Sequence, residues 1–159
     1  MRRVGGAAAP FAHPLLSLFL GGFLLALAMQ RWNLHRRIAL AIVTRAGSRP
    51  RHLVLGAMLA TAFLSMWISN TATAMMMMPI AASLITVMHW ESGELSAAER
   101  ENFATAIMLG IAYAASIGGM ATLIGSPPNA LMASFMGQEF GVEVSFARWM
   151  ALALPVALV

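Results

Sequence analysis

The sequence contains no cysteine, no aspartate and no lysine. The missing cysteines exclude disulfides, thiolate metal sites and cysteine nucleophiles. Charged residues make up 10% of the 159 residues, whereas soluble domains typically carry about 25%. Hydrophobic residues make up 60%, and the mean hydropathy is +0.77. So few charges could not cover the surface of a water-soluble domain, and the composition therefore predicts a membrane protein.

Signatures of catalysis and of resident cofactors are also missing. The sequence has no Ser-His-Asp arrangement, no phosphate-binding loop and no dinucleotide fingerprint. The four histidines are scattered without the spacing of metal ligands. The net charge is +4, but six of the ten arginines fall between Arg31 and Arg51, as in a cytoplasmic membrane loop. We therefore expect no enzyme, no cofactor and no nucleic-acid partner.

The first 50 residues predict a scaffold-type transmembrane helix followed by an interfacial helix. The apolar run Leu15–Met29 leads into arginines rather than a cleavage site, so we interpret it as a retained membrane helix over residues 14–30. In the next segment Leu34, Ile38 and Ile42 recur at helical spacing between arginines. This pattern is typical of an amphipathic helix at the membrane surface, although a solvated basic loop also fits.

Residues 51–90 predict a helical hairpin. The stretch from 52 to 90 has no formal charge over 39 residues, which is too long for one straight crossing. The polar run Ser69–Thr73 interrupts it near the middle, where a hairpin tip would lie. Both ends of the hairpin should then lie on the cytoplasmic side, with the arginine-rich segment.

Residues 91–146 predict a polar loop and a broken transmembrane helix. Ser96 and Glu99 fit a capping box at the start of that helix. The charge-free stretch 102–138 contains helix breakers between Gly118 and Pro128. We expect one half-helix to about residue 117 and a second from about residue 129. Residues 147–159 begin another apolar segment, which we interpret as a truncated transmembrane helix.

Two interruptions at membrane depth predict a binding site. Irregular backbone survives there only inside protein or around a water-filled cavity. Broken helices are typical of ion-coupled carriers, because helix N-termini attract anions and unwound carbonyls or hydroxyls can hold a cation. The breaks at 69–73 and within 118–128 should therefore approach each other. Structural interpretations stay open: Ser65 could bond to the preceding turn, and Gly118-Gly119 could serve close helix packing.

Two motifs resemble those of the divalent anion/sodium symporter family. The run Ser65–Met76 resembles the Ser-Asn-Thr hairpin of that family, and Ser116–Asn129 resembles its broken helix. The lead-in at His13-Pro14 and Phe19–Phe23 is also similar. The resemblance extends over residues 13–150 and implies an all-α, elevator-type homodimer built from two inverted repeats.

The resemblance also implies roles for individual residues. A sodium ion, the coupling ion, would be bound by Ser65, Ser69, Asn70, Gly118 and Gly119. Asn70 and Thr71 would contact a carboxylate of a small anionic substrate, and Ser126, Pro127 and Asn129 would belong to the loop that shapes the site. The protein would lie in lipid, in a bacterial-type plasma membrane.

The family has two copies of each motif, and this chain has one. The sequence therefore resembles an N-terminal half, and function belongs to the full-length parent: sodium-coupled uptake of a dicarboxylate or similar divalent anion. Two alternatives stay open. One is a non-transporting membrane scaffold or assembly subunit, and the other is a related carrier of citrate, sulfate or arsenite, or one coupled to protons.

Overall fold

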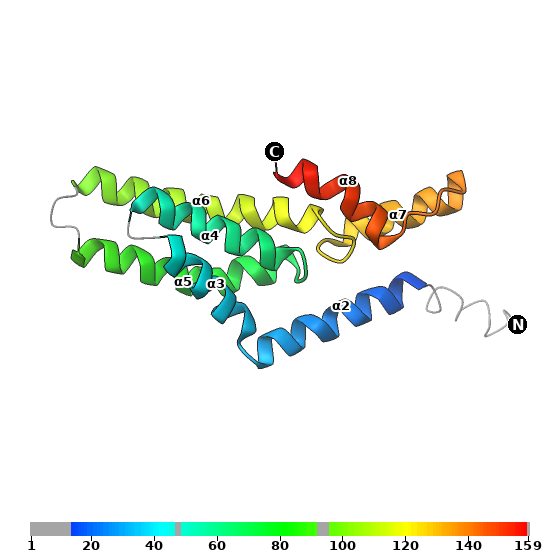
Figure 1. Ribbon diagram of the computed structural model, residues 1–159, viewed down its shortest axis with the longest axis horizontal. Helices are drawn as coiled ribbons and strands as arrows, with labels where there is room; N and C mark the ends of the chain where they lie inside the picture. The colour runs from blue at the N-terminus through cyan, green and yellow to red at the C-terminus, as the bar shows by residue number, and fades with distance from the viewer. Residues whose placement is uncertain (1–13, 47–48, 92–95, 159) are drawn as a thin grey trace, which may run out of the picture.

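The protein is built from helices throughout the part that the structure, a computed structural model, describes: residues 14–46, 49–91 and 96–158. The helices are α2 (Pro14–Arg31), α3 (Leu34–Ala46), α4 (Pro50–Ser65), α5 (Asn70–Glu91), α6 (Ala97–Met120), α7 (Pro127–Phe140) and α8 (Phe146–Leu158). The predicted all-α class is confirmed for these residues. Figure 1 shows α4 and α6 running in one direction along the molecule and α5 returning between the same two ends.

Local sequence explains where several helices begin and end. Pro50 and Pro127 each occupy the first helical position, where the missing N–H leaves no hydrogen bond unmade. At the start of α6 the predicted capping box forms, because Ser96 and Glu99 satisfy each other's backbone N–H groups. Helix α7 ends at Gly141, whose φ of 64° lies in the left-handed region that glycine adopts without strain.

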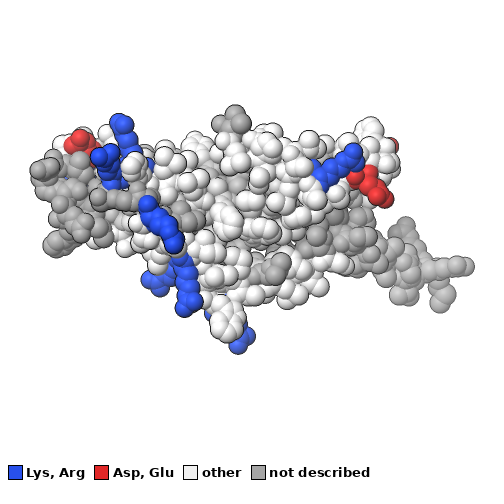
Figure 2. Space-filling view, viewed as in Figure 1, with Lys and Arg blue, Asp and Glu red and all other residues white. Residues whose placement is uncertain are grey.

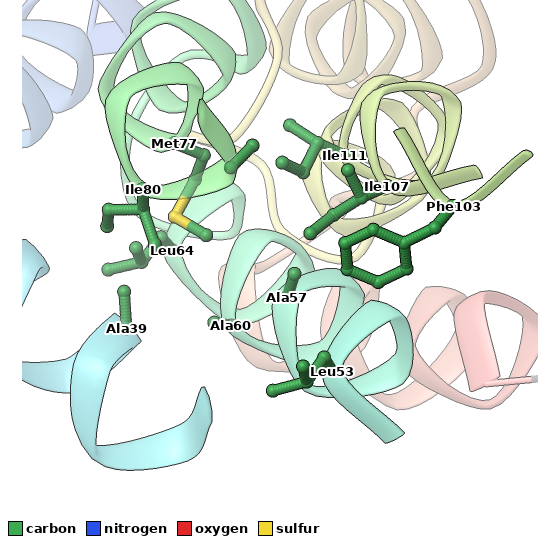
Figure 3. Packing of buried hydrophobic residues seen from close by; sticks show 11 residues of the cluster. Ala39, Leu53, Ala57, Ala60, Leu64, Met77, Ile80, Phe103, Ile107 and Ile111 are labelled. Carbon is green, nitrogen blue, oxygen red and sulfur yellow. The ribbon is translucent and has the colours of Figure 1, made fainter. Parts of the chain in front are cut away.

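The core lies where α3, α4, α5 and α6 meet (Figure 3). Helix α4 is central, because it contacts α3, α5 and α6. One face of α4 is buried at helical spacing, and it packs against matching faces of α5 and α6. The buried residues are Leu53, Ala57, Ala60 and Leu64 from α4, Met77, Ile80 and Ala81 from α5, Phe103, Ile107 and Ile111 from α6, and Ala39 from α3.

The other helices expose large apolar side chains. Examples are Leu24 and Leu27 on α2, Leu131 on α7, and Leu152 and Val156 on α8, each more than half exposed. Within the described residues, one helix, α6, is long and apolar enough by itself to cross a bilayer. The segments Leu20–Arg31 and Phe146–Leu158 are apolar but shorter.

Three element boundaries differ from the sequence-based expectation. The arginine-rich segment forms the helix α3, as predicted, and the differences lie at the two interruptions. The first interruption lies at residues 66–69, and α5 already begins at Asn70. Helix α6 continues to Met120, three residues beyond the predicted end, and α7 begins at Pro127 rather than at Asn129. Asn70 and Thr71 thus lie in the first turn of α5 rather than in the interruption itself.

Candidate ion and substrate site

The two helix interruptions lie side by side, as the sequence predicts (Figure 1). Thr122, which is completely buried, joins the two interruptions through hydrogen bonds. Its hydroxyl donates a hydrogen bond to the carbonyl oxygen of Met66 in the first interruption. The Thr122 hydroxyl oxygen also accepts a hydrogen bond of 3.0 Å from the backbone N–H of Gly125 in the second interruption. One side chain therefore ties the residue 66–69 turn to the residue 121–126 segment.

Oxygen atoms from the end of α4, from α6 and from the second interruption converge on the side chain of Asn70. One end of its amide lies 2.9 Å from Ser65 Oγ, 3.2 Å from the carbonyl oxygen of Ala115 and 3.3 Å from that of Gly125. Ser65 Oγ already donates its only proton to Ala115 O at 2.6 Å. The amide nitrogen therefore fits this end when it has only these three oxygens as partners. With the amide turned over, its oxygen could accept from Ser65 Oγ at 2.9 Å and would face the two carbonyl oxygens, an arrangement that a cation would stabilise.

Asn129 holds the second interruption in place through two hydrogen bonds. Its side-chain nitrogen donates to the carbonyl oxygens of Gly119 at 2.8 Å and Thr122 at 2.7 Å. These carbonyls belong to the end of α6 and the start of the unwound segment, where helical partners run out. The amide is buried with 9% of its surface exposed. Asn129 thus holds the loop in shape through hydrogen bonds made within the protein.

Gly118 and Gly119 let α6 approach its neighbours. A Cβ on Gly118 would lie 2.1 Å from the carbonyl oxygen of Ala62, and one on Gly119 would lie 1.9 Å from Asn70 Oδ1. A side chain at Gly118 would require the backbone of α4 or α6 to move, and one at Gly119 would displace the Asn70 amide. The carbonyl of Gly118 accepts a bond from Ala121, and that of Gly119 accepts one from Asn129. The structure therefore places both glycines next to the oxygen cluster and gives them a packing role there.

The other predicted site residues lie on the outer side of the cluster. Ser69 and Thr71 are exposed on either side of Asn70. Ser69 precedes α5, and its Oγ is 3.4 Å from the backbone N–H of Ala72. Ser126 precedes α7 in an extended conformation and makes no side-chain cap. Pro127 is exposed and, with Ser69, lines a small cavity of about 30 Å³ against α2.

Helix ends give the site its electrostatic character, since the charge-free stretches bring no formal charge to it. Helices α4 and α6 end at the interruptions, and α5 and α7 begin there. C-termini carry partial negative charge and N-termini partial positive charge, so the same place can attract a cation and an anion. The two N-termini are not equivalent, because Pro127 and Pro128 of α7 have no N–H to offer. An anion would therefore find its backbone donors at the start of α5.

Sequence reasoning missed three residues of the cluster. Ala115 and Gly125 contribute carbonyl oxygens, and Thr122 contributes the bridging hydroxyl. The sequence contains a signal that could have indicated Thr122, because it is the one hydroxyl residue between Gly118-Gly119 and Gly125. The sequence contains no such signal for Ala115, because this residue contributes a backbone carbonyl in the middle of α6. Within the described residues no three His, Cys, Asp or Glu side chains come together as a metal site.

Comparison with known proteins identifies the family of the chain. The model of the citrate transporter family matches residues 2–159. The sodium-dependent dicarboxylate transporter SdcS of Staphylococcus aureus, in strains USA300, NCTC 8325 / PS 47 and COL, is 43% identical over 150 residues. The match covers 94% of this chain and 29% of each relative, so the chain spans less than a third of their length. The chain therefore belongs to the citrate transporter family and, through its sodium-dependent dicarboxylate relatives, to the divalent anion/sodium symporters, which are membrane transport proteins rather than enzymes.

Proposed function

We propose that this chain forms one half of the binding site of a secondary active transporter that couples sodium to uptake of a dicarboxylate or similar divalent anion. The observation that carries the proposal is the convergence of Ser65 Oγ, Ala115 O and Gly125 O on the Asn70 amide. Sodium is a hard cation that prefers oxygen ligands, and unwound carbonyls bind it in carriers of this kind. The name of SdcS, which states sodium dependence and dicarboxylate transport, supports the same function.

In this proposal the Asn70 side chain acts as a switch between two states. Without sodium, the side-chain nitrogen of Asn70 donates hydrogen bonds to the hydroxyl of Ser65 and to the two carbonyl oxygens, so these oxygens have a partner within the protein. With sodium, the amide turns and its oxygen joins the others as a ligand. The negative ends of α4 and α6 favour the cation. The outward amide nitrogen of Asn70 can then donate to a substrate, which couples the two ligands through one side chain. Ser69 and the backbone of Gly118 and Gly119 were predicted as further ligands and remain part of the proposal.

The substrate carboxylate would bind at the start of α5. Asn70 and Thr71 lie in the first turn of that helix, where backbone N–H groups have no intrahelical partners. Thr71 is exposed and offers its hydroxyl beside them. No acidic side chain lies in the charge-free stretches to repel an anion. Ser126, Pro127 and Asn129 would shape the opposite wall.

Family membership supports a proposal for the architecture of the whole carrier. We propose that α4 and α5 form a membrane hairpin open to the cytoplasm, and that α6 and α7 form the broken helix. The full-length protein would contain a second, inverted repeat and would work as an elevator-type homodimer in a bacterial-type plasma membrane. Sodium would serve as the coupling ion, and no resident cofactor would be required.

Asn70→Ala in the full-length protein tests the sodium site. Losing a hydrogen bond to a charged group should weaken sodium binding by about 10- to 100-fold. Weaker sodium binding lowers substrate affinity by the same factor, because the coupling is reciprocal. The measurement is succinate uptake into proteoliposomes with sodium titrated at fixed succinate, and then succinate titrated at fixed sodium.

Ser116→Ala is the matched control for this experiment. Ser116 lies on α6 one position after Ala115, but its hydroxyl bonds back to Ala112 O at 3.2 Å and faces away from the cluster. Its uptake should keep the sodium dependence of the unchanged protein. Normal sodium dependence in folded Asn70→Ala protein would contradict the assignment and leave Asn70 as a structural residue.

A further inference from the structure

A cavity lies between α3 and α5, away from the helix interruptions. Its volume is about 450 Å³, within the range of small-molecule sites. Its lining includes Arg36 and Leu40, one turn apart on α3, and Pro79, Ile80, Ser83 and Leu84 on one face of α5. The wall is therefore apolar except for one guanidinium group and one hydroxyl. This combination suits a ligand with a charged head and an apolar tail.

Among the described residues, Arg36 is the one charged side chain in the lining, and Glu91 at the end of α5 lies outside it. Helix α3 contains Arg36, Arg37 and Arg45 and no acidic residue, and Arg31 ends the preceding helix. The first acidic residue of the sequence is Glu91. Figure 2 shows a row of basic side chains over α3, with no acidic side chain beside them on that face. A negatively charged head group would therefore meet attraction from several arginines and direct contact with one.

We infer that this cavity binds an anionic glycerophospholipid, with the phosphate paired to Arg36 and an acyl chain along Leu40, Ile80 and Leu84. Arginine suits a phosphate because its guanidinium group can donate two parallel hydrogen bonds. The Ser83 hydroxyl can add a further donor. The other arginines of α3 select a negative lipid over a zwitterionic one, because they raise the local positive potential. This inference requires a membrane protein but does not depend on the proposed sodium site.

The bound lipid would contact both α3 and α5. Helix α3 packs on the core through Ala39, which is fully buried beside α4 and α5 (Figure 3). A lipid in the cavity would fill the space beside this contact and hold the arginine face of α3 at the level of the phosphates. The position of α3, and with it that of the α4–α5 pair, would then depend on lipid composition.

Lipid binding to the purified full-length protein in detergent tests the inference. The probes are phosphatidylglycerol and phosphatidylcholine, titrated separately and followed by native mass spectrometry. Arg36→Gln should weaken phosphatidylglycerol binding by about 10-fold or more, because it removes a charge-assisted pair. Phosphatidylcholine binding should change little. Arg45→Gln removes the same charge from the same helix, but Arg45 does not line the cavity and donates to Ala41 O. Its effect should stay within about 2-fold, as expected for long-range charge alone.

A second pair of variants tests the cavity without changing charge. Ser83→Phe fills the space, whereas Ala82→Phe places the same ring on an adjacent, exposed position outside the lining. Only Ser83→Phe should weaken phosphatidylglycerol binding, and thermal unfolding of each variant confirms that it is folded. Equal losses in Arg36→Gln and Arg45→Gln, or no loss in folded Ser83→Phe, would overturn the inference. Arg36-dependent binding of inorganic phosphate that displaces the lipid would replace it with a simple anion site.

Discussion

Thr73 is the residue whose environment is hardest to reconcile with its chemistry. It lies one turn after Asn70 and is completely buried, yet its hydroxyl has no hydrogen-bond partner among the described residues. Buried threonines in helices usually donate to the carbonyl four residues earlier, as Thr61 does to Ala57 at 2.6 Å. An unpaired buried hydroxyl costs about 1–3 kcal/mol. A residue that carries this cost beside a proposed ion site invites a direct measurement.

Thr73→Val removes the hydroxyl and keeps the shape of the side chain. If the hydroxyl has no partner, the free energy of unfolding should stay unchanged or rise by up to about 3 kcal/mol, the cost of burying an unpaired hydroxyl. Thr61→Val is the matched control, because it removes a hydroxyl that is equally buried but bonded, and it should cost about 0.5–1.5 kcal/mol. Both values come from reversible unfolding in mixed micelles. A larger loss for Thr73→Val than for Thr61→Val would mean that Thr73 has a partner, such as a buried water or ion.

At the scale of elements, the contact between α4 and α6 sets the geometry of the site. Gly118 faces the backbone of Ala62, and Gly119 faces the Asn70 side chain. Ser65 adds a hydrogen bond from the end of α4 to Ala115 of α6. Because the backbones of α4 and α6 meet at Gly118 without a Cβ between them, small displacements of α6 move the oxygen cluster directly.

Gly118→Ala should separate these helices. The new methyl group would lie 2.1 Å from Ala62 O, and backbone atoms must shift to admit it. We expect a loss of about 1–3 kcal/mol in the free energy of unfolding, as for overpacked cores. Gly137→Ala is the control, because its Cβ would meet only Val142 O at 3.9 Å on an exposed face of α7. This variant should gain about 0.5–1 kcal/mol from the better helix propensity of alanine. Equal effects at both positions would show that propensity, not packing, decides the role of Gly118.

These contacts also explain how far the sequence predicts the elements. Charge-free stretches, prolines and the capping box are local signals, and they locate the helices and the two interruptions. The end of α6 is not local. Two consecutive glycines predict a break, but Ala62 and Asn70 pack against them and keep α6 helical to Met120. In the same way Asn70 begins a helix because Ser69 can accept from its first turn, and the sequence shows the residue types without showing that geometry. The role of Ala115 could not be predicted from its residue type, because this residue contributes only a backbone carbonyl.

At the scale of the whole molecule, helix lengths constrain how the chain can lie in a membrane. Helix α4 has 16 residues, or about 24 Å at the rise of an α-helix, which is less than the hydrocarbon thickness of about 30 Å. Helix α5 then runs back beside α4 rather than onward (Figure 1). The turn between them contacts the end of α6 through Thr122, so the break in α6 lies at the depth of that turn. In the proposed hairpin and broken-helix arrangement, α7 would continue from that depth toward the opposite side of the membrane.

This arrangement predicts which side of the membrane each connection occupies. Thr44 on α3 and Ala98 at the start of α6 should both face the cytoplasm, and Val142 after α7 should face the opposite side. All three are exposed, and the sequence has no cysteine, so single cysteines at these positions can be labelled with a membrane-impermeant maleimide. In intact cells only Val142→Cys should react, and in inside-out vesicles only Thr44→Cys and Ala98→Cys should react. Labelling of Thr44 and Ala98 from different sides would mean that the α4–α5 pair crosses the membrane, and the oxygen cluster would then belong to a structural contact rather than to a transport site.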